Sequence, residues 1–531
     1  MLEDIIRERR KKMDLLKEKG IDPYPARIMR TGDMLDALDA FERLAAEHTE
    51  ISLAGRVRSL RDQGKIIFAD LEDETGKIQA VLREDMLPDL AFWRSVIDTG
   101  DFLSVTGTLF LTKRGEKSIE AHTLQFAGKT LKPLPDKWDG IQDVELRLRE
   151  RYVDLLAHPD VREMFVRKSL FWASVREFLE NEGFLEVETS VLEPEAGGAE
   201  AEPFKTHHNA LDTDFYLRIA LELQLKKLVV GGFDKVFEIG RVFRNEGIDR
   251  EHLQDFTFME CYWAYHDYRD LMKMLQRMFR FVIEHTMGTL STHWHGHEID
   301  WSGEWPEVDY VSEFTKVNGL NPIKATRDEL FMKAKSLGLA PEGSLEKGRL
   351  IDLIYKKTVR PTLVQPCFLT GTPIIVSPLA KASPENPDIA ERFQIVACGT
   401  ELGNGFSELN DPDEQRRRFE AQMALRAKGD NEAMLLDEDF LNALSHGLPP
   451  TAGFGMSERV FAVLVDRPIR ETVFFPLMRR MKEDVQDHKE PSPVEGGDPK
   501  GKSERTSERS SSAANAAGAK KTPVKRGRKE D

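Results

Sequence analysis

The segment FRNEG at residues 243–247 is followed, after a polar gap of eight residues, by the segment FTFME at residues 256–260. Runs of this kind predict two antiparallel strands joined by a loop. Arg244 and Glu246 are two positions apart, so on a strand they would project from the same face. Arg244 can clamp a phosphate or a carboxylate through its planar fork, Glu246 accepts hydrogen bonds, and His252 in the loop can reach a terminal phosphate. The two segments therefore predict a nucleotide site without a glycine-rich loop.

A lone Arg-x-Glu pattern is common and usually marks an ion pair on a half-buried sheet, but here other segments extend it. Together they make the chain resemble a bacterial-type lysyl-tRNA synthetase of class II, from roughly residue 5 to residue 482. The resemblance implies an α+β fold, with an N-terminal OB-fold β-barrel and a class II synthetase catalytic domain built on an antiparallel sheet flanked by helices. The segments that carry it are GFLEVET (183–189), THHNALDTDFYLRIALEL (206–223), LVVGGFDKVFEIGRVFRNEG (228–247), LGNGFSELNDPDEQ (402–415) and HGLPPTAGFG (446–455).

Composition is typical of a soluble intracellular enzyme. The 531 residues exceed what one core usually serves, so several domains are expected. Three scattered cysteines, Cys261, Cys367 and Cys398, suit neither a disulfide framework nor a zinc site, which favours a reducing cytoplasm. The N-terminus lacks the apolar run of a signal peptide, and no segment approaches the ~20 apolar residues of a membrane span, so we expect no membrane contact. A formal net charge of −16 limits any contact with RNA to local surfaces.

The order of patterns along the chain predicts where its domains lie, and the resemblance implies what these domains are. A charged amphipathic helix, whose basic face is either solvated or in contact with RNA, ends near Gly20. Five short period-two runs between Ile51 and Phe126 predict a small closed barrel of the OB type. We expect a helical segment at 1–48, an OB-fold anticodon-binding domain at 49–130, a linker at 131–150, a class II catalytic domain at 151–482 that opens with a helix near 160–182, and a disordered basic tail at 483–531.

The resemblance implies that the barrel reads the anticodon of tRNA(Lys). Phe68 would stack on the central uridine, and Gln79 and Glu116 would supply donors and acceptors that distinguish a uracil edge. Taken alone, Phe68 would be read as a core aromatic residue.

The resemblance also assigns a pocket for L-lysine. Glu222, with backbone near Gly198, would hold the α-ammonium group. Glu408 would hold the ε-ammonium group and set specificity, because a buried carboxylate without its cation costs several kcal/mol. Tyr262 would help Glu408, Glu260 would orient Tyr262, Phe406 would lie beside the aliphatic stem, and Arg244 with Asn404 would hold the substrate carboxylate.

By the same resemblance, ATP binds beside this pocket. Phe256 would stack under the adenine with Arg459 above it, and Arg244 would contact the α-phosphate. His252 and Arg459 would reach toward the γ-phosphate, and Glu246 belongs to the same surface. The implied reaction forms lysyl-adenylate and pyrophosphate and then transfers lysine to tRNA. No protein nucleophile is required, so positioning and electrostatics would supply the rate.

The chain departs from the family pattern at several positions. The metal-binding glutamates of the family correspond to Gln394 and Glu401, so Glu401 is the expected Mg²⁺ ligand and Gln394 a weaker one. The arginine motif is one residue short between Gly453 and Arg459. Ser190 replaces the proline that ends a strand at the expected homodimer interface, which could loosen that interface.

Four functions compete for this sequence. An aspartyl- or asparaginyl-type relative would need a cationic or amide-reading group where the chain has Glu408. A barrel-free lysine ligase that modifies a protein does not account for residues 51–126. An RNA-binding or regulatory paralogue would be expected to have lost some of the ATP-site residues. The lysine–tRNA ligase is therefore favoured, and the basic tail would either tether tRNA or only aid solubility.

Overall fold

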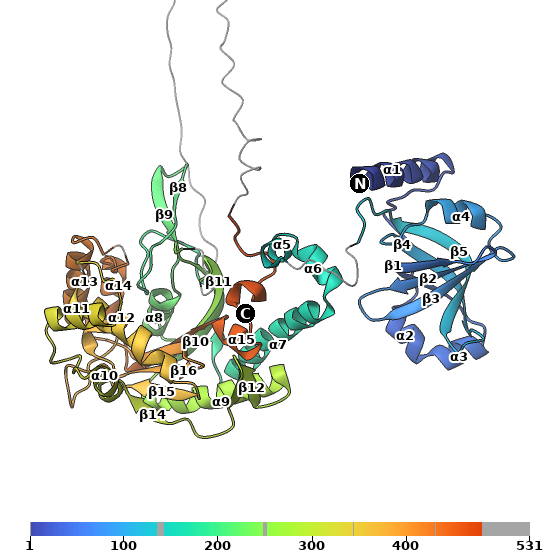
Figure 1. Ribbon diagram of the computed structural model, residues 1–531. Coiled ribbons are helices and arrows are strands. Elements are labelled where there is room, and N and C mark those ends of the chain that lie inside the picture. The colour runs from blue at the N-terminus through green and yellow to red at the C-terminus, as the bar shows by residue number, and fades with distance from the viewer. Residues whose placement is uncertain (1, 135–142, 248–251, 344, 431, 480–531) are drawn as a thin grey trace, which may run out of the picture. The chain divides into compact units, whose positions relative to one another are not determined.

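A five-stranded barrel forms the N-terminal part of the computed structural model, which describes residues 2–134, 143–247, 252–343, 345–430 and 432–479 (Figure 1). Its barrel closes in the order β1-β2-β3-β5-β4, which confirms the expected OB-type barrel. Alternate residues of each strand face the barrel core, as Ile67, Ala69 and Leu71 do in β2. The strands are β1 (Glu50–Asp62), β2 (Ile66–Glu72), β3 (Lys77–Arg83), β4 (Phe102–Leu111) and β5 (Lys117–Gly128), and α4 (Leu90–Val96) lies between β3 and β4 in the chain.

Three N-terminal helices share the core of this barrel: α1 (Leu2–Glu18), α2 (Met34–Asp39) and α3 (Phe41–Ala46). Leu16, Met34 and Phe41 are buried in the same hydrophobic cluster as the barrel strands. Arg9 of α1, which the sequence analysis did not single out, is buried and donates hydrogen bonds of 3.1 Å to the carbonyls of Thr99, Thr130 and Lys132. The helices of this N-terminal segment therefore share one hydrophobic cluster with the barrel strands.

A buried ion cluster lies directly after strand β5. Lys129 has no exposed side-chain surface, and its Nζ lies 2.8 Å from Asp101 Oδ2 and 2.6 Å from Asp98 Oδ2. Burial raises the pKa of Asp101, and the attraction of Lys129 opposes that rise. The stability of the barrel should therefore depend on Lys129.

Replacing Lys129 by methionine should destabilise the barrel by about 3–5 kcal/mol, because Asp101 would be left as an unpaired buried charge. Hydrogen exchange of β4 and β5 peptides across a urea series measures this loss. The control is Lys113→Met, which removes an exposed lysine from the β4–β5 turn. Equal urea midpoints for the two variants would contradict the account.

The larger part of the molecule is built on an eight-stranded sheet in the order β14-β15-β16-β17-β18-β11-β10-β6. The central pairings are antiparallel, as expected, whereas the β14–β15 and β10–β6 pairings at the two edges are parallel. The strands are β6 (Leu185–Glu186), β10 (Lys235–Phe243), β11 (Asp255–Ala264), β14 (Glu307–Asp309), β15 (Cys367–Thr370), β16 (Arg392–Ala397), β17 (Thr400–Ser407) and β18 (Thr451–Ser457).

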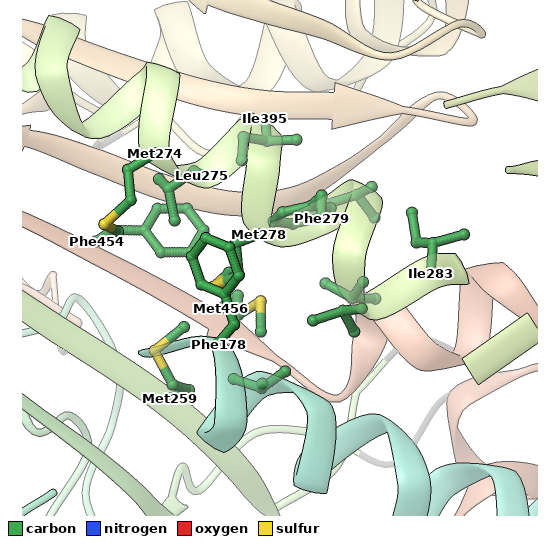
Figure 2. Packing of buried hydrophobic residues seen from close by; sticks show 14 of the residues in the cluster. Phe178, Met259, Met274, Leu275, Met278, Phe279, Ile283, Ile395, Phe454 and Met456 are labelled. Atoms are coloured by element: carbon green, nitrogen blue, oxygen red, sulfur yellow. The ribbon is translucent and has the colours of Figure 1, made fainter. Parts of the chain in front are cut away.

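One face of this sheet packs against α7 (Pro159–Asn181) and α9 (Tyr268–Met287). Figure 2 shows Met274, Met278 and Phe279 of α9 among side chains from the strands, such as Met259 and Met456. Because side chains alternate along a strand, the even-numbered residues of β11 point to the opposite face. That second face carries the candidate site.

The remaining helices and small sheets surround the large sheet. Figure 1 shows the hairpin of β8 and β9 projecting from this part of the chain. Residues 135–142 of the expected linker and the expected tail at 483–531 lie outside the described residues. No helix in the described ranges is both long and apolar enough to cross a membrane. The elements are α5 (Val144–Arg149), α6 (Arg151–Ala157), β7 (Leu192–Glu193), β8 (Lys205–His208), β9 (Thr213–Leu217), α8 (Glu222–Val230), β12 (Ser291–Trp294), β13 (His297–Asp300), α10 (Tyr310–Asn318), α11 (Arg327–Ser336), α12 (Lys347–Thr358), α13 (Pro412–Arg426), α14 (Glu438–Ser445) and α15 (Arg459–Leu464).

Candidate active site

Strand register assembles the site across three neighbouring strands, β11, β18 and β17. Glu260 of β11 pairs with Gly455 of β18, which pairs in turn with Asn404 of β17. Two residues further along β11 and β17, Tyr262 and Phe406 both pair with Gly453. A Cβ atom at Gly453 would collide with a Glu408 oxygen and with the ring of Tyr262. The glycines of β18 therefore keep space open between two rows of functional side chains.

Three buried carboxylates gather on this face, although they come from distant parts of the chain. Glu222 begins α8, Glu260 lies within β11, and Glu408 directly follows β17. The hydroxyl of Tyr262 donates a 2.8 Å hydrogen bond to Glu260, and the backbone N–H of Leu221 donates one of 3.0 Å. Burial, with repulsion from Glu222, raises the pKa of Glu260 to about 8. So dense an acidic cluster is costly unless a cation joins it.

Glu408 is the least satisfied of the three carboxylates. Its side chain is fully buried and forms an ion pair with Lys226. Apart from that ion pair, neither of its oxygens accepts a hydrogen bond from any residue that the structure describes. A buried carboxylate in this state is suited to an incoming ammonium group, which carries both charge and donors.

Lys226 was not singled out in the sequence, yet it lies inside the cluster. It follows Glu222 by four residues on α8, has no exposed side-chain surface, and places Nζ 2.5 Å from Glu222 Oε1. A Glu–Lys pair at this spacing is usually a surface feature of a helix. The four-residue spacing of Glu222 and Lys226 is visible in the sequence, but it did not indicate that Lys226 is buried.

Arg244 and Glu246 do lie close together, but not for the reason that the sequence suggested. Strand β10 ends at Phe243, so the alternation argument for this pair was wrong. The N–H of Arg244 donates to the carbonyl of Gln254, and the N–H of Glu246 donates to that of Arg244, each at 2.8 Å, so the chain turns there. His252 Nε2 lies 4.0 Å from Glu246 Oε2, so the turn brings those two together. Residues 248–251 lie outside the described ranges.

The guanidinium of Arg244 lies over two aromatic rings of β11. Its Cζ is 5.3 Å from the centre of the Phe256 ring and 5.8 Å from that of Phe258. Its Nε donates a 3.2 Å hydrogen bond to the carbonyl of Ile219. These contacts fix the guanidinium on the same face as Glu260.

Asn404 and Glu401 each have a neighbour on β16. The side-chain oxygen of Asn404 accepts a 2.7 Å hydrogen bond from Arg392, a residue that the sequence did not single out. The amide of Gln394 donates to Glu401 at 2.8 Å and accepts from the hydroxyl of Tyr355 at 3.3 Å. The amide of Gln394 thus occupies one carboxylate oxygen of Glu401, while the oxygen of Gln394 is already engaged.

The remaining residues of the predicted site border the same face. Arg459 begins α15 directly after Glu458, whose buried carboxylate pairs with Lys168 of α7 and accepts from the N–H of Thr257 at 3.2 Å. Gly198 has a positive φ of 83°, and a Cβ there would lie 3.1 Å from Glu222 Cβ. The loop around Gly198 thus approaches the first turn of α8 closely.

Two of the three predicted base-reading residues lie on strands of the barrel, and the third lies in a turn between two of its strands. Phe68 and Gln79 alternate with core residues of β2 and β3, so both face outward, and each is half-buried. The oxygen of Gln79 accepts a 3.2 Å hydrogen bond from Ser118 of β5. Glu116 is exposed in the turn between β4 and β5. This surface presents one aromatic ring with polar groups nearby.

Comparison with known proteins gives independent information on both parts. Residues 143–479 match the family model described as tRNA synthetases class II (D, K and N), and residues 51–126 match the OB-fold nucleic acid binding domain. The lysine--tRNA ligase of Moorella thermoacetica is 45% identical over 90% of this chain and 99% of its own length. Those of Carboxydothermus hydrogenoformans and Bacillus subtilis are 42% and 41% identical, each over 90% of this chain and 98% of their own length.

Proposed function

The chain belongs to the class II lysine--tRNA ligases, and from this premise we propose which of its residues recognise lysine, ATP and tRNA. The activity of the family is ATP-dependent ligation of an amino acid to tRNA. Aminoacylation of tRNA(Lys) with labelled lysine tests the overall reaction. Charging that requires lysine and ATP supports the proposal, and charging with aspartate or asparagine contradicts it.

Glu408 is the residue that selects lysine. The observation that carries this assignment is its fully buried carboxylate, which accepts no hydrogen bond within the described residues beyond its ion pair with Lys226. The ε-ammonium group of lysine supplies three donors and a positive charge. Tyr262, held by Glu260, lies against the same space. An amino acid of the same length without this ammonium group leaves the carboxylate unmatched and is rejected.

The other end of the substrate is held near α8 and the end of β10. Glu222 takes the α-ammonium group together with backbone at Gly198. Arg244 and Asn404 take the carboxylate, and Phe406 packs along the aliphatic stem. This arrangement supports the reaction because it leaves a carboxylate oxygen of lysine next to Arg244, the residue that also holds the α-phosphate of ATP.

Activation proceeds by direct displacement at phosphorus. A carboxylate oxygen of lysine attacks the α-phosphorus of ATP, the bond to the bridging oxygen breaks, and pyrophosphate leaves. Arg244 stabilises the charge that develops on the α-phosphate, His252 and Arg459 reach toward the γ-phosphate, and Glu246 accepts hydrogen bonds on the same surface. Phe256 stacks on the adenine. In the second step, a hydroxyl of the terminal adenosine of tRNA attacks the lysyl carbonyl, and AMP leaves.

Magnesium fits this site through Glu401. Within the described ranges, no cluster of three or more His, Cys, Asp or Glu residues could hold a metal ion alone. Mg²⁺ commonly uses one or two carboxylates together with substrate phosphates, so Glu401 and ATP form a sufficient donor set. When bound, the ion neutralises phosphate charge. Gln394, whose amide already bonds to Glu401 and Tyr355, is a poor second ligand.

The barrel reads the anticodon through Phe68, Gln79 and Glu116. Replacing Phe68 by alanine should raise the KM for tRNA(Lys) roughly tenfold to a hundredfold, because stacking on one base contributes about 1–3 kcal/mol. Lysine-dependent pyrophosphate exchange without tRNA should not change. Phe92→Ala, which removes a half-buried phenylalanine from α4 of the same domain, is the control. An unchanged KM for tRNA in the Phe68 variant would remove Phe68 from the anticodon site.

A homodimer in the cytoplasm is the expected working form. Val166 and Leu170, one turn apart on α7, are 60% and 44% exposed, and Leu185 of the neighbouring β6 is 49% exposed. Such an apolar stripe suits a self-complementary interface. Ser190, which replaces the expected proline, donates a 2.9 Å hydrogen bond to the carbonyl of Leu192 and so shapes the turn there. Light scattering should give twice the chain mass of 60.6 kDa, whereas a monomer would contradict this interface.

A further inference from the structure

Lys226 places a positive charge at the centre of the acidic pocket. Its ammonium group is wholly buried, lies 2.5 Å from Glu222 Oε1 and forms an ion pair with Glu408. The rings of Phe406 and Phe440 lie 5.5 Å and 5.7 Å from its nitrogen. Residues from α8, β17 and α14 therefore enclose this one cation between the two carboxylates that receive the ammonium groups of the substrate.

The two carboxylates could not easily remain charged together without this cation. Burial raises the pKa of both Glu222 and Glu408, and Lys226 is the strongest group that opposes the rise in each. Burial alone would lower the pKa of Lys226, but attraction to the two carboxylates outweighs it and raises that pKa. When ionised, Glu260 repels Glu408 and raises the pKa of Glu408 further. Two buried like charges in such a site otherwise share one proton.

We propose that Lys226 is a positioning residue for amino-acid recognition, which keeps Glu222 and Glu408 ionised together so that the pocket accepts a substrate with two ammonium groups. The proposal rests on the lysine-binding roles of Glu222 and Glu408 given above. Lys226 does not contact the reacting atoms. It acts through the two carboxylates, and its removal leaves a pocket that matches one ammonium group but not two.

The test compares lysine with two analogues that each lack one ammonium group. 6-Aminohexanoate has no α-ammonium group, and norleucine has no ε-ammonium group. In Lys226→Met, the KM for lysine should rise roughly 30-fold or more, because a buried carboxylate loses its cation. The preference for lysine over each analogue, measured as inhibition constants in pyrophosphate exchange, should fall at least tenfold. The KM for ATP should stay within twofold.

Lys227→Met is the matched control, since Lys227 is the next residue on α8 and pairs with Asp439 at the surface. Its lysine KM and its preference should equal those of the unmodified enzyme. A Lys226→Met enzyme with unchanged lysine KM, or with a raised KM and unchanged preference, would overturn the proposal, because a purely structural role weakens all three ligands alike. Unmodified enzyme without lysine-dependent exchange would instead contradict the proposed function.

A second variant covers the case in which Lys226→Met does not fold. The double variant Lys226→Met with Glu222→Gln removes the cation and one carboxylate together, so Glu408 keeps its charge without a like-charged neighbour at α8. This enzyme should lose its preference for lysine over 6-aminohexanoate but keep its preference over norleucine. Loss of both preferences, or of neither, would overturn the assignment.

Discussion

Replacing Glu408 by glutamine should lower kcat/KM for lysine in pyrophosphate exchange by about a thousandfold. The change keeps the size of the side chain but removes the charge that the ε-ammonium group needs. Loss of one partner of a buried ion pair costs about 3–5 kcal/mol, and each 1.4 kcal/mol corresponds to a factor of about ten. Most of the loss should appear in the KM for lysine, since Glu408 lies away from the phosphates.

The control for this variant is Glu438→Gln. Glu438 is exposed and pairs with Arg416 on the surface, so its replacement should leave lysine activation unchanged. Thermal unfolding of both variants shows whether the Glu408 variant is folded. A folded Glu408→Gln enzyme that retains most of its lysine kcat/KM would show that another group reads the ε-ammonium.

Replacing Arg244 by lysine should lower kcat for adenylate formation by roughly 100- to 1,000-fold, the scale for removing one preorganised donor from a developing charge. Lysine keeps the positive charge but lacks the planar fork that can hold a phosphate and a carboxylate at once. It also loses the contact with the rings of Phe256 and Phe258. Single-turnover measurement of adenylate formation isolates this step.

Arg241→Lys is the matched control, because Arg241 lies three residues before Arg244, on β10, is half exposed and pairs with Asp255. The control should retain nearly the full rate. Equal rates for the two variants would mean that charge alone is sufficient at position 244, and would remove Arg244 from its proposed role at the α-phosphate.

The sequence predicted well those parts of the fold in which the alternation of apolar and polar residues directly indicates which side chains are buried. In the barrel, period-two alternation marks which residues face inward, as in Ile67, Ala69 and Leu71 of β2. The same alternation in FTFME separates Phe256, Phe258 and Glu260, which face the site, from Met259, which faces α9 (Figure 2). The barrel and the pairing of these strands could therefore be predicted from local patterns, while the family was predicted from the resemblance of whole segments.

The features that sequence missed depend on contacts between distant segments. Lys226 resembles a surface residue paired with Glu222, and only packing against Phe406 and Phe440 buries it. Arg9 was not singled out in the sequence, and carbonyls of the chain beyond β5 accept hydrogen bonds from its buried side chain. Strand β10 ends at Phe243, just before a local bond from the N–H of Glu246 to the carbonyl of Arg244, which no strand period reveals.

The similarity to known proteins also separates three of the four functions that compete for the sequence, all but the RNA-binding or regulatory paralogue. The barrel at residues 51–126 and near full-length similarity to lysine--tRNA ligases exclude a barrel-free ligase and favour lysine over aspartate or asparagine. An activity measurement decides whether the enzyme works with Gln394 in place of a second metal-binding carboxylate. Because Gln394 already bonds to Glu401, we expect that Glu401 and the phosphates of ATP are sufficient to hold Mg²⁺.

The most direct test of this account is ATP–pyrophosphate exchange with each amino acid in turn, with Mg²⁺ present and no tRNA. The account predicts exchange with lysine alone, because only lysine places an ammonium group against the buried carboxylate of Glu408. Exchange driven by aspartate or asparagine, or by no amino acid at all, would contradict it.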